Sequence, residues 1–180
     1  MNDEQVIIPE TYVIDANVLI EAKNRYYAFD ICPAFWDSLL INHAKSRIES
    51  IDKVKKEIND GNYGDEIKKW IKATVPPSFF CATDDNDVIK DYQEIINWVM
   101  HQPQYFLEAK EEFANGADGW LIAHVKAQKD NKILVTHEVL NLESKKRVPI
   151  PNVCTAFGVK WKNTFEMLRE LKTQFVLPKD

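Results

Sequence analysis

Glycine is scarce in this chain, with only five glycines among 180 residues. None of them falls in a GxGxxG or GxxxxGKS/T pattern. Rossmann and P-loop sites need those glycines so that backbone N–H groups can approach phosphates. We therefore expect no nucleotide site of either kind.

Cysteine is also scarce, and the three cysteines lie far apart without a CxxC pair: Cys32, Cys81 and Cys154. The four histidines form no HExxH or HxH spacing: His43, His101, His124 and His137. These spacings predict neither a disulfide framework nor a CxxC zinc site. We expect three reduced, mostly buried thiols.

An excess of positive charge is absent, since 23 Lys and Arg face 28 Asp and Glu, a net charge of −5. This excludes a strongly basic domain that coats phosphates, so action on nucleic acid would need a local site. No apolar stretch approaches the ~20 residues of a membrane span. The beginning, MNDEQVIIPE, does not resemble a signal peptide. We expect a cytoplasmic protein without a membrane segment.

What the chain does contain is typical of a folded domain, with 45% hydrophobic and 28% charged residues. Residues 12–20 form an apolar run that predicts a buried strand turning into a helix near 16–21, and residues 132–136 predict a second strand. Strands that alternate with helices indicate an α/β fold. We expect one domain over residues 1–180, a three-layer α/β/α architecture around a central parallel sheet. A helical elaboration is expected at about 59–115.

Apolar periodicity and helix-ending residues predict the remaining elements. Helices are expected over residues 33–46, 52–60, 64–74, 84–101, 103–115, 116–128 and 163–174, and a short strand over 47–51. Asp84 is expected to cap the helix that follows it, and Gly61 to end the helix before it. Residues 23–32 are expected to form an aromatic loop.

Asp15 is the most informative residue, because it interrupts the apolar run YVIDANVLI. A carboxylate buried without a partner is costly, so an apolar strand rarely contains one without a reason. One interpretation is a cap at a strand-to-helix turn, which Asn17 would serve as well. The other is a functional site, because ligands bind at the carboxyl ends of strands in open α/β sheets.

Other polar residues at strand ends and helix starts are ordinary when taken singly. Asp118 would suit the first turn of a helix, and Glu57 a solvated helix face. Thr136 and Glu138 end the second predicted strand. Together with Asp15 they place four acidic residues at such positions in one α/β domain.

The order of these segments resembles a PIN domain, the nuclease fold of VapC-like toxins and of several RNA-processing enzymes. The matching pieces are VIDANVLI, VKKEI, GADGWLIAHVKAQ and Thr136-His137-Glu138, and the segment EAKNRYYAFDICPAFWDSL looks like an uncharacterised subfamily. The resemblance spans about residues 12–159 and implies a PIN-like fold. It also implies a catalytic and metal-binding set formed by Asp15, Glu57, Asp118 and Glu138.

Hard divalent ions held by carboxylates suit phosphodiester hydrolysis, so one or two Mg²⁺ or Mn²⁺ ions are expected at this set. Asn17 and Thr136 would orient the carboxylates or a metal-bound water. The fourth acidic position is often Asp in the family and is Glu138 here. Glu143 is a rival for that position, which Asn141 could assist.

Basic and aromatic residues near the motifs are candidates for contacting RNA. The expected phosphate groove comprises Lys23, Arg25, Lys53, Lys55 and Lys56, and a further basic set comprises Lys126, Lys129, Lys145, Lys146 and Arg147. The rings of Tyr26, Tyr27 and Phe29 would either stack on bases or pack in the core. His137 is expected to face solvent.

The leading hypothesis is a metal-dependent endoribonuclease that hydrolyses phosphodiester bonds in single-stranded or structured RNA. The resemblance implies the toxin of a type II toxin–antitoxin system, with a cognate antitoxin as partner and a homodimer as its assembly. The alternative is a catalytically silent PIN-like module that binds RNA or protein. A phosphatase of the haloacid-dehalogenase type is rejected, because it needs a second Asp where this chain has Asn17.

Overall fold

Five parallel strands form the centre of the molecule in the computed structural model, which describes residues 9–128 and 131–176. The strands are β1 Thr11–Ile14, β2 Ile48–Ile51, β3 Phe80–Cys81, β4 Lys132–Val135 and β5 Trp161–Lys162. Their order in the sheet is β3-β2-β1-β4-β5. The apolar run of the first strand suits its central place, since Val13 and Ile14 are fully buried.

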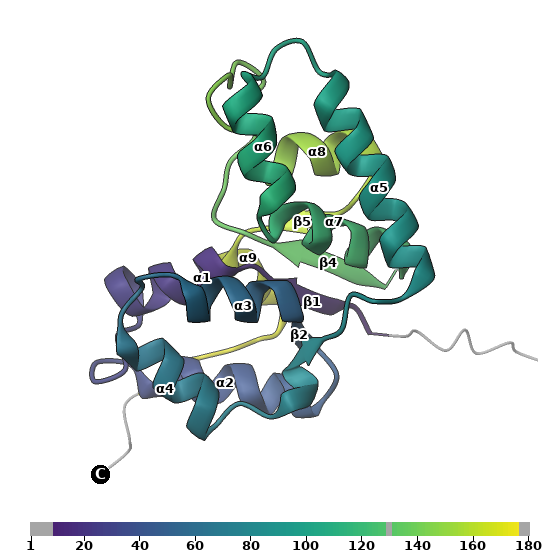
Figure 1. Cartoon of the computed structure of the whole chain (residues 1–180). Coiled ribbons are helices and arrows are strands. Elements are labelled where there is room, and N and C mark those ends of the chain that lie inside the picture. Colours follow the sequence, from purple (N-terminus) through teal and green to yellow (C-terminus); the bar gives the residue numbers. More distant parts are fainter. Residues whose placement is uncertain (1–8, 129–130, 177–180) are drawn as a thin grey trace, which may run out of the picture.

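Helices flank the sheet, so the three-layer α/β/α architecture expected from the sequence is confirmed. They are α1 Ala16–Glu21, α2 Pro33–Ala44, α3 Asp52–Asp60, α4 Asp65–Ala73, α5 Asn86–His101, α6 Leu107–Asn115, α7 Asp118–Ala127, α8 Ile150–Phe157 and α9 Thr164–Glu170. Figure 1 shows α5, α6, α7 and α8 grouped beside β4 and β5, while α1 to α4 form a second group.

Helix α7 connects the sheet to the surrounding helices. It packs against β4, β2 and α8 and runs along α5, and Leu121 and Ile122 on it are fully buried. Helix α9 is tied to β1, where the Tyr12 hydroxyl donates a hydrogen bond of 2.5 Å to Glu170. The contacts of α7 therefore hold it against β4 and β2.

The section over 59–115 differs in one respect from the predicted helical elaboration. It does hold α4, α5 and α6, but it also supplies strand β3. Phe80 and Cys81 of that strand pair with Ser50 and Ile51 of β2. This section is therefore part of the central sheet, because the short apolar FFC stretch completes its edge.

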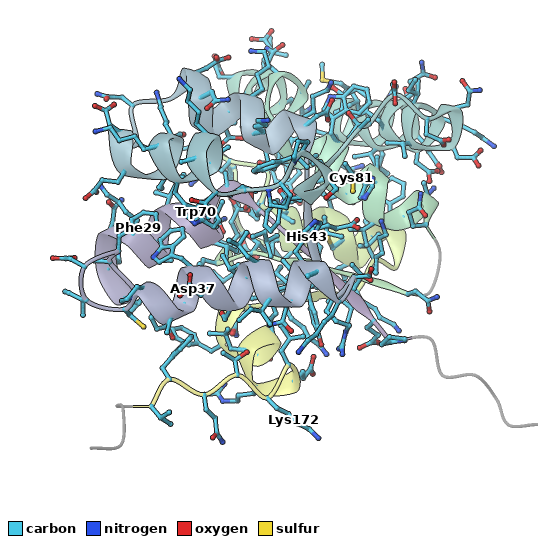
Figure 2. All side chains as sticks on the ribbon, turned by 90° about the horizontal axis from the view of Figure 1, so that it is seen from below. Phe29, Asp37, His43, Trp70, Cys81 and Lys172 are labelled. Carbon is cyan, nitrogen blue, oxygen red and sulfur yellow. The ribbon has the colours of Figure 1, made fainter. Side chains whose placement is uncertain are left out.

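The expected aromatic loop is wrong for its first half, because Ala22–Tyr26 form a π-helix, η1, that continues α1. Two of the three rings pack in the core: Tyr27 stacks on Phe35 at 4.5 Å, and Phe29 stacks on Trp36 at 3.8 Å. Figure 2 shows Phe29 near Trp70 of α4. Tyr26 is the exposed ring, with 51% of its surface accessible.

Two local predictions need correction or addition. Helix α5 is capped by Asp85, whose side chain accepts a hydrogen bond of 2.9 Å from the Asp87 N–H, and not by Asp84. The C-terminal region contains α8 and β5 before α9, elements that the sequence pattern did not separate. In the described ranges, no helix is long and apolar enough to cross a membrane.

Candidate functional site

Asp15 occupies the turn between β1 and α1, and its side chain is buried. One carboxylate oxygen accepts a hydrogen bond of 2.6 Å from the Ala16 N–H, and the other accepts one of 3.1 Å from the Thr136 hydroxyl. The capping interpretation of Asp15 is therefore correct. The same carboxylate also lines a cavity, so the capping role does not exclude a functional one.

Thr136 and Asn17 link the ends of β1 and β4. The Asn17 side-chain amide donates a hydrogen bond of 2.8 Å to the Thr136 hydroxyl and accepts one of 3.0 Å from the His137 N–H. The Thr136 hydroxyl also accepts from the Glu138 N–H at 3.1 Å. Thr136 therefore contacts the Asp15 carboxylate directly, and Asn17 holds the Thr136 hydroxyl and the backbone after β4.

All four predicted acidic residues line one cavity of about 830 Å³ at the carboxyl end of β1. Asp15 follows β1, Glu57 lies on α3, Asp118 begins α7 and Glu138 follows the end of β4. They come from four separate segments, and the parallel topology brings these segments to one edge of the sheet. Tyr63 and Trp120, which the sequence analysis did not select, line the same cavity.

The electrostatics of this carboxylate cavity reflect burial and mutual repulsion. Burial, together with the charges of Glu57 and Glu138, raises the pKa of Asp15 to about 7. Burial, then the charges of Asp15, Glu138 and Glu57, raise the pKa of Asp118 well above its ordinary value. Burial also raises the pKa of Glu57, against a backbone hydrogen bond at Ala117. Such a group of carboxylates favours protons or cations.

Both oxygens of the Glu138 carboxylate also have partners in the protein. One of its oxygens accepts a hydrogen bond of 2.7 Å from the Ile150 N–H at the start of α8, and the other lies 3.5 Å from the Arg147 guanidinium. Its rival, Glu143, lines a neighbouring cavity of about 860 Å³, as does Asn141. The structure therefore places Glu138, and not Glu143, with the other three.

Two of the lysines on α3 reach the carboxylate cavity, and one does not. Lys53 and Lys56 line it together with Glu57. The Lys55 ammonium instead lies 5.5 Å from the Phe80 ring. Residues three or four positions apart share a helix face, as Lys53 does with Lys56 and Glu57, whereas residues two positions apart do not. The sequence spacing therefore already indicated that Lys55 faces away from Lys53 and Glu57.

The remaining predicted cations are divided between different surroundings. Lys23 pairs with Glu66 at 3.4 Å and lines neither cavity. Arg25 pairs with Glu21 at 2.6 Å and lines the neighbouring cavity. Arg147, which was only in the further basic set, lines both cavities and is therefore the cation that joins them.

The further basic set is likewise dispersed. Lys145 and Lys146 line the neighbouring cavity, and Lys126 binds Asp91 at 2.5 Å and Glu94 at 2.9 Å on α5. Lys129 lies outside the described residues.

His137 does not face solvent, contrary to expectation. It is half-buried, its Nε2 lies 2.9 Å from the Thr164 hydroxyl, and the rings of Tyr26 and Phe165 lie near it. Burial lowers the pKa of the imidazole. The beginning of α9 covers this side chain, which the strand-end position could not reveal.

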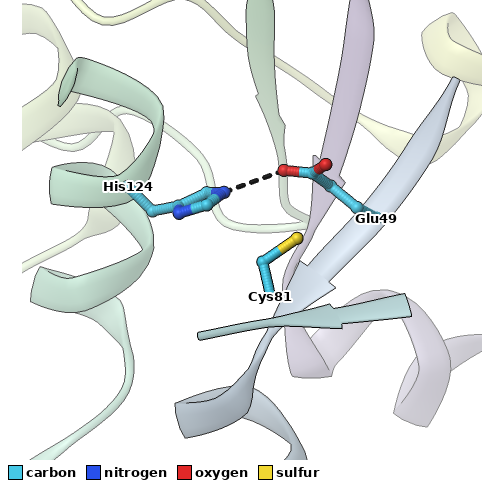
Figure 3. Close-up of side chains that lie close together, drawn as sticks. All are labelled: Glu49, Cys81 and His124. Atoms are coloured by element: carbon cyan, nitrogen blue, oxygen red, sulfur yellow. Dashed lines mark hydrogen bonds and ion pairs between the residues drawn. The ribbon is translucent and has the colours of Figure 1, made fainter. Parts of the chain in front are cut away.

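A second cluster lies on the sheet away from these carboxylates and could hold a metal ion: Glu49, Cys81 and His124. Their ligand atoms all lie within 4.8 Å of one another (Figure 3). Among the described residues, no three of the carboxylates in the cavity bring oxygens this close. All three cysteines are free, and Cys154 alone is buried, so the expectation of mostly buried thiols holds only for that residue.

The fold and its acidic edge define an α/β domain with a parallel sheet and four carboxylates in one cavity. The chain belongs to the family described as Domain of unknown function (DUF4411), which matches residues 12–175. Comparisons with curated proteins and with solved structures gave no match.

Proposed function

We propose that this protein is a metal-dependent endoribonuclease with its active site in the carboxylate cavity. The observation that carries the proposal is the convergence of Asp15, Glu57, Asp118 and Glu138 from four segments on one cavity. The order of their motifs also resembles that of PIN domains. Burial and mutual repulsion raise the pKa of three of these carboxyl groups, although Arg147 lies beside Glu138, and a bound cation would relieve this repulsion.

The donor set fits a hard divalent cation such as Mg²⁺ or Mn²⁺. It consists of oxygen atoms from carboxylates, which these ions prefer, and Mg²⁺ keeps several waters and so needs few protein ligands. Asp15, Asp118, Glu57 and Glu138 would hold one or two ions. When bound, the ion supplies an activated water and neutralises charge that develops on the phosphate.

The residues around the carboxylates have supporting tasks. Thr136 and Asn17 keep the Asp15 carboxylate and the end of β4 in a fixed arrangement through their hydrogen bonds. Lys53 and Lys56, on the rim, would attract RNA phosphates despite the negative net charge of the chain. The exposed Tyr26 ring in the neighbouring cavity would stack on a base.

We further propose that the enzyme acts as the toxin of a type II toxin–antitoxin system, as the resemblance implies. A basic segment of a cognate antitoxin would complement the acidic cavity. A homodimer is the proposed assembly. Growth arrest on induced expression, relieved by Asp15→Asn, would support this role, whereas unaffected growth with an active enzyme would contradict it.

Cleavage of single-stranded RNA tests the enzymatic proposal. We expect wild type to cleave with Mn²⁺ and not with EDTA. Asp15→Asn and Asp118→Asn should lower the rate by at least ~100-fold, since each removes a proposed ligand while keeping the side-chain shape. Equal cleavage by wild type and both variants would overturn the site.

Comparing Glu138→Gln with Glu143→Gln tests which of the two glutamates is the fourth acidic residue of the site. The first should reduce cleavage by roughly 10–100-fold, and the second should leave the rate unchanged, because Glu143 lines only the neighbouring cavity. RNA binding without cleavage by wild type would favour the silent PIN-like module instead.

A further inference from the structure

Three side chains of different chemical character meet between the sheet and α7. Glu49 comes from β2, Cys81 from the edge strand β3 and His124 from α7, and their ligand atoms lie within 4.8 Å of one another (Figure 3). Carboxylate, thiolate and imidazole together suit Zn²⁺ and similar divalent transition metals. Mg²⁺, which prefers oxygen ligands, does not suit this set.

The cluster already surrounds a positive charge. The Lys132 ammonium donates a hydrogen bond to Glu49 and lies 3.0 Å from His124 Nε2, which itself lies 2.8 Å from a Glu49 carboxylate oxygen. Burial would raise the pKa of Glu49, but hydrogen bonds from His124 and Lys132 lower it to about 2. Glu49 is therefore an anionic ligand at neutral pH.

The contacts of His124 Nε2 conflict with one another. Nε2 either donates to Glu49 or accepts from Lys132, and one neutral nitrogen cannot do both. Among the described residues, the buried Nδ1 has no hydrogen-bond partner that would fix the tautomer. A cation that accepts electron pairs from both Nε2 and the Glu49 oxygen removes the conflict.

We propose that Glu49, Cys81 and His124 bind one Zn²⁺-type ion through a carboxylate oxygen, a thiolate and Nε2, with water as a fourth ligand. On binding, the Cys81 thiol releases its proton to solvent and its sulfur bonds to the metal. The flexible side chain of Lys132, at the first residue of β4, turns away from the site. Ligand atoms of tetrahedral zinc lie about 3.3–3.8 Å apart. His124 Nε2 and the Glu49 oxygen, 2.8 Å apart, therefore separate slightly, and the Cys81 sulfur, within 4.8 Å of both, shifts by about 1 Å or less.

The site would fasten the edge of the sheet to the helix that carries the proposed catalytic Asp118. Strand β3 has only two residues, and the ion would bind it to β2 and α7 at once. His124 lies six residues after Asp118, which is about 9 Å along the helix axis. The two sites are therefore separate, and they differ in ligand chemistry.

Co²⁺ is the probe, because a cobalt–thiolate bond gives a charge-transfer absorption that cobalt on carboxylates does not. Full-length protein stripped with EDTA should develop this band with one equivalent of Co²⁺, and Zn²⁺ should remove it. Cys81→Ser should lack the band, whereas Cys32→Ser, which alters another half-buried thiol, should keep it. Asp118→Asn should keep it as well.

Lys132→Met tests whether the Lys132 ammonium has to leave the site before the metal binds. Because a charge-assisted hydrogen bond no longer has to be broken, Co²⁺ should bind about tenfold more tightly. Absence of the band in wild type, or its persistence in Cys81→Ser, would overturn the proposal. Loss of the band in Asp118→Asn would also contradict it, because the thiolate site would then depend on the carboxylate cavity.

A measurement on wild type covers the case in which Cys81→Ser does not fold. Alkylation followed by peptide mapping should show Cys81 protected at least several-fold by one equivalent of Zn²⁺, with Cys32 labelled at an unchanged rate. Equal labelling of Cys81 with and without Zn²⁺ would contradict the site.

Discussion

Thr136 shows how one hydroxyl can organise a site. It donates to Asp15 and accepts hydrogen bonds from Asn17 and from the Glu138 N–H, so it contacts two of the four carboxylate-bearing segments. The residue is fully buried at the end of β4. Because a buried group that loses its partner is costly, the hydroxyl matters more than the shape of the side chain.

Thr136→Val should therefore lower the free energy of unfolding by about 1–3 kcal/mol, because it leaves the Asn17 amide and the Glu138 N–H without an acceptor. Thr136→Ser keeps the hydroxyl and should lose less. Urea unfolding of both variants measures the difference. A Val variant as stable as the Ser variant would show that the hydroxyl has no structural role.

At the scale of elements, helix starts decide several features of the fold. Two neighbouring aspartates, Asp84 and Asp85, precede α5, and the sequence analysis predicted the first of them as its cap. In the structure only the Asp85 side chain reaches a backbone N–H at the first turn, that of Asp87. The backbone conformation before the helix makes this choice, which the residue type does not.

Asp85→Ala should reduce stability by about 0.5–2 kcal/mol, as the loss of an N-cap does. Asp84→Ala is the matched control and should change it by less than ~0.5 kcal/mol, as exposed positions without such a contact do. Thermal or urea unfolding distinguishes the two variants. The opposite ranking would assign the cap to Asp84.

Helix α7 carries one residue of each proposed site. Asp118 at its first position faces the carboxylate cavity, and His124 farther along meets Glu49. Its apolar residues Leu121 and Ile122 are buried at the same time. Packing of this helix therefore positions both proposed sites, although they share no ligand.

At the scale of the whole molecule, part of the acidity is concentrated in one cavity. Asp15, Glu57, Asp118 and Glu138 lie together in the cavity, and burial and their repulsion raise the pKa of Asp15 to about 7. A carboxyl whose pKa is higher in the folded than in the unfolded protein stabilises the fold at low pH. This contribution is lost as the pH rises from about 4 to about 7.

Metal-free wild type should therefore become less stable than Asp15→Asn as the pH rises from 5 to 8. One pKa unit corresponds to about 1.4 kcal/mol, and ~1 kcal/mol moves the Tm of a chain of this size by ~2–4 °C, so we expect a difference of several degrees. His137, whose lowered pKa makes the fold less stable as the pH falls, is present in both proteins. Its contribution therefore cancels when the two are compared. Melting curves in EDTA at both pH values measure this difference.

Mg²⁺ or Mn²⁺ at millimolar concentration is the second arm of the same experiment. Binding to the folded state should raise the free energy of unfolding of wild type by about 2.7 kcal/mol at a metal concentration 100 times Kd, and the Tm rises with it. Asp15→Asn should gain less. A wild-type Tm that is independent of both pH and metal would contradict the carboxylate site.

The local patterns of the sequence determined the class of the fold, strands β1, β2 and β4 and most of the helices, but not β3, α8 or β5. The apolar run around Asp15 and the continuous apolar strand at 132–136 are local features, because burial on both faces of a sheet demands them. The same run also made Asp15 stand out as a residue that required an explanation. The structure established the partners of its carboxylate, the Ala16 N–H and the Thr136 hydroxyl, and the cavity that it lines.

The tertiary structure alone decided which distant residues meet. Glu49, Cys81 and His124 are separated by 32 and 43 residues, so no spacing motif connects them, and the absence of a CxxC pair hid a candidate metal cluster. The packing of α3 likewise turned Lys53 and Lys56 toward the cavity and Lys55 toward Phe80. Sequence periodicity fixes which residues share a face of an element, whereas only packing fixes what that face meets.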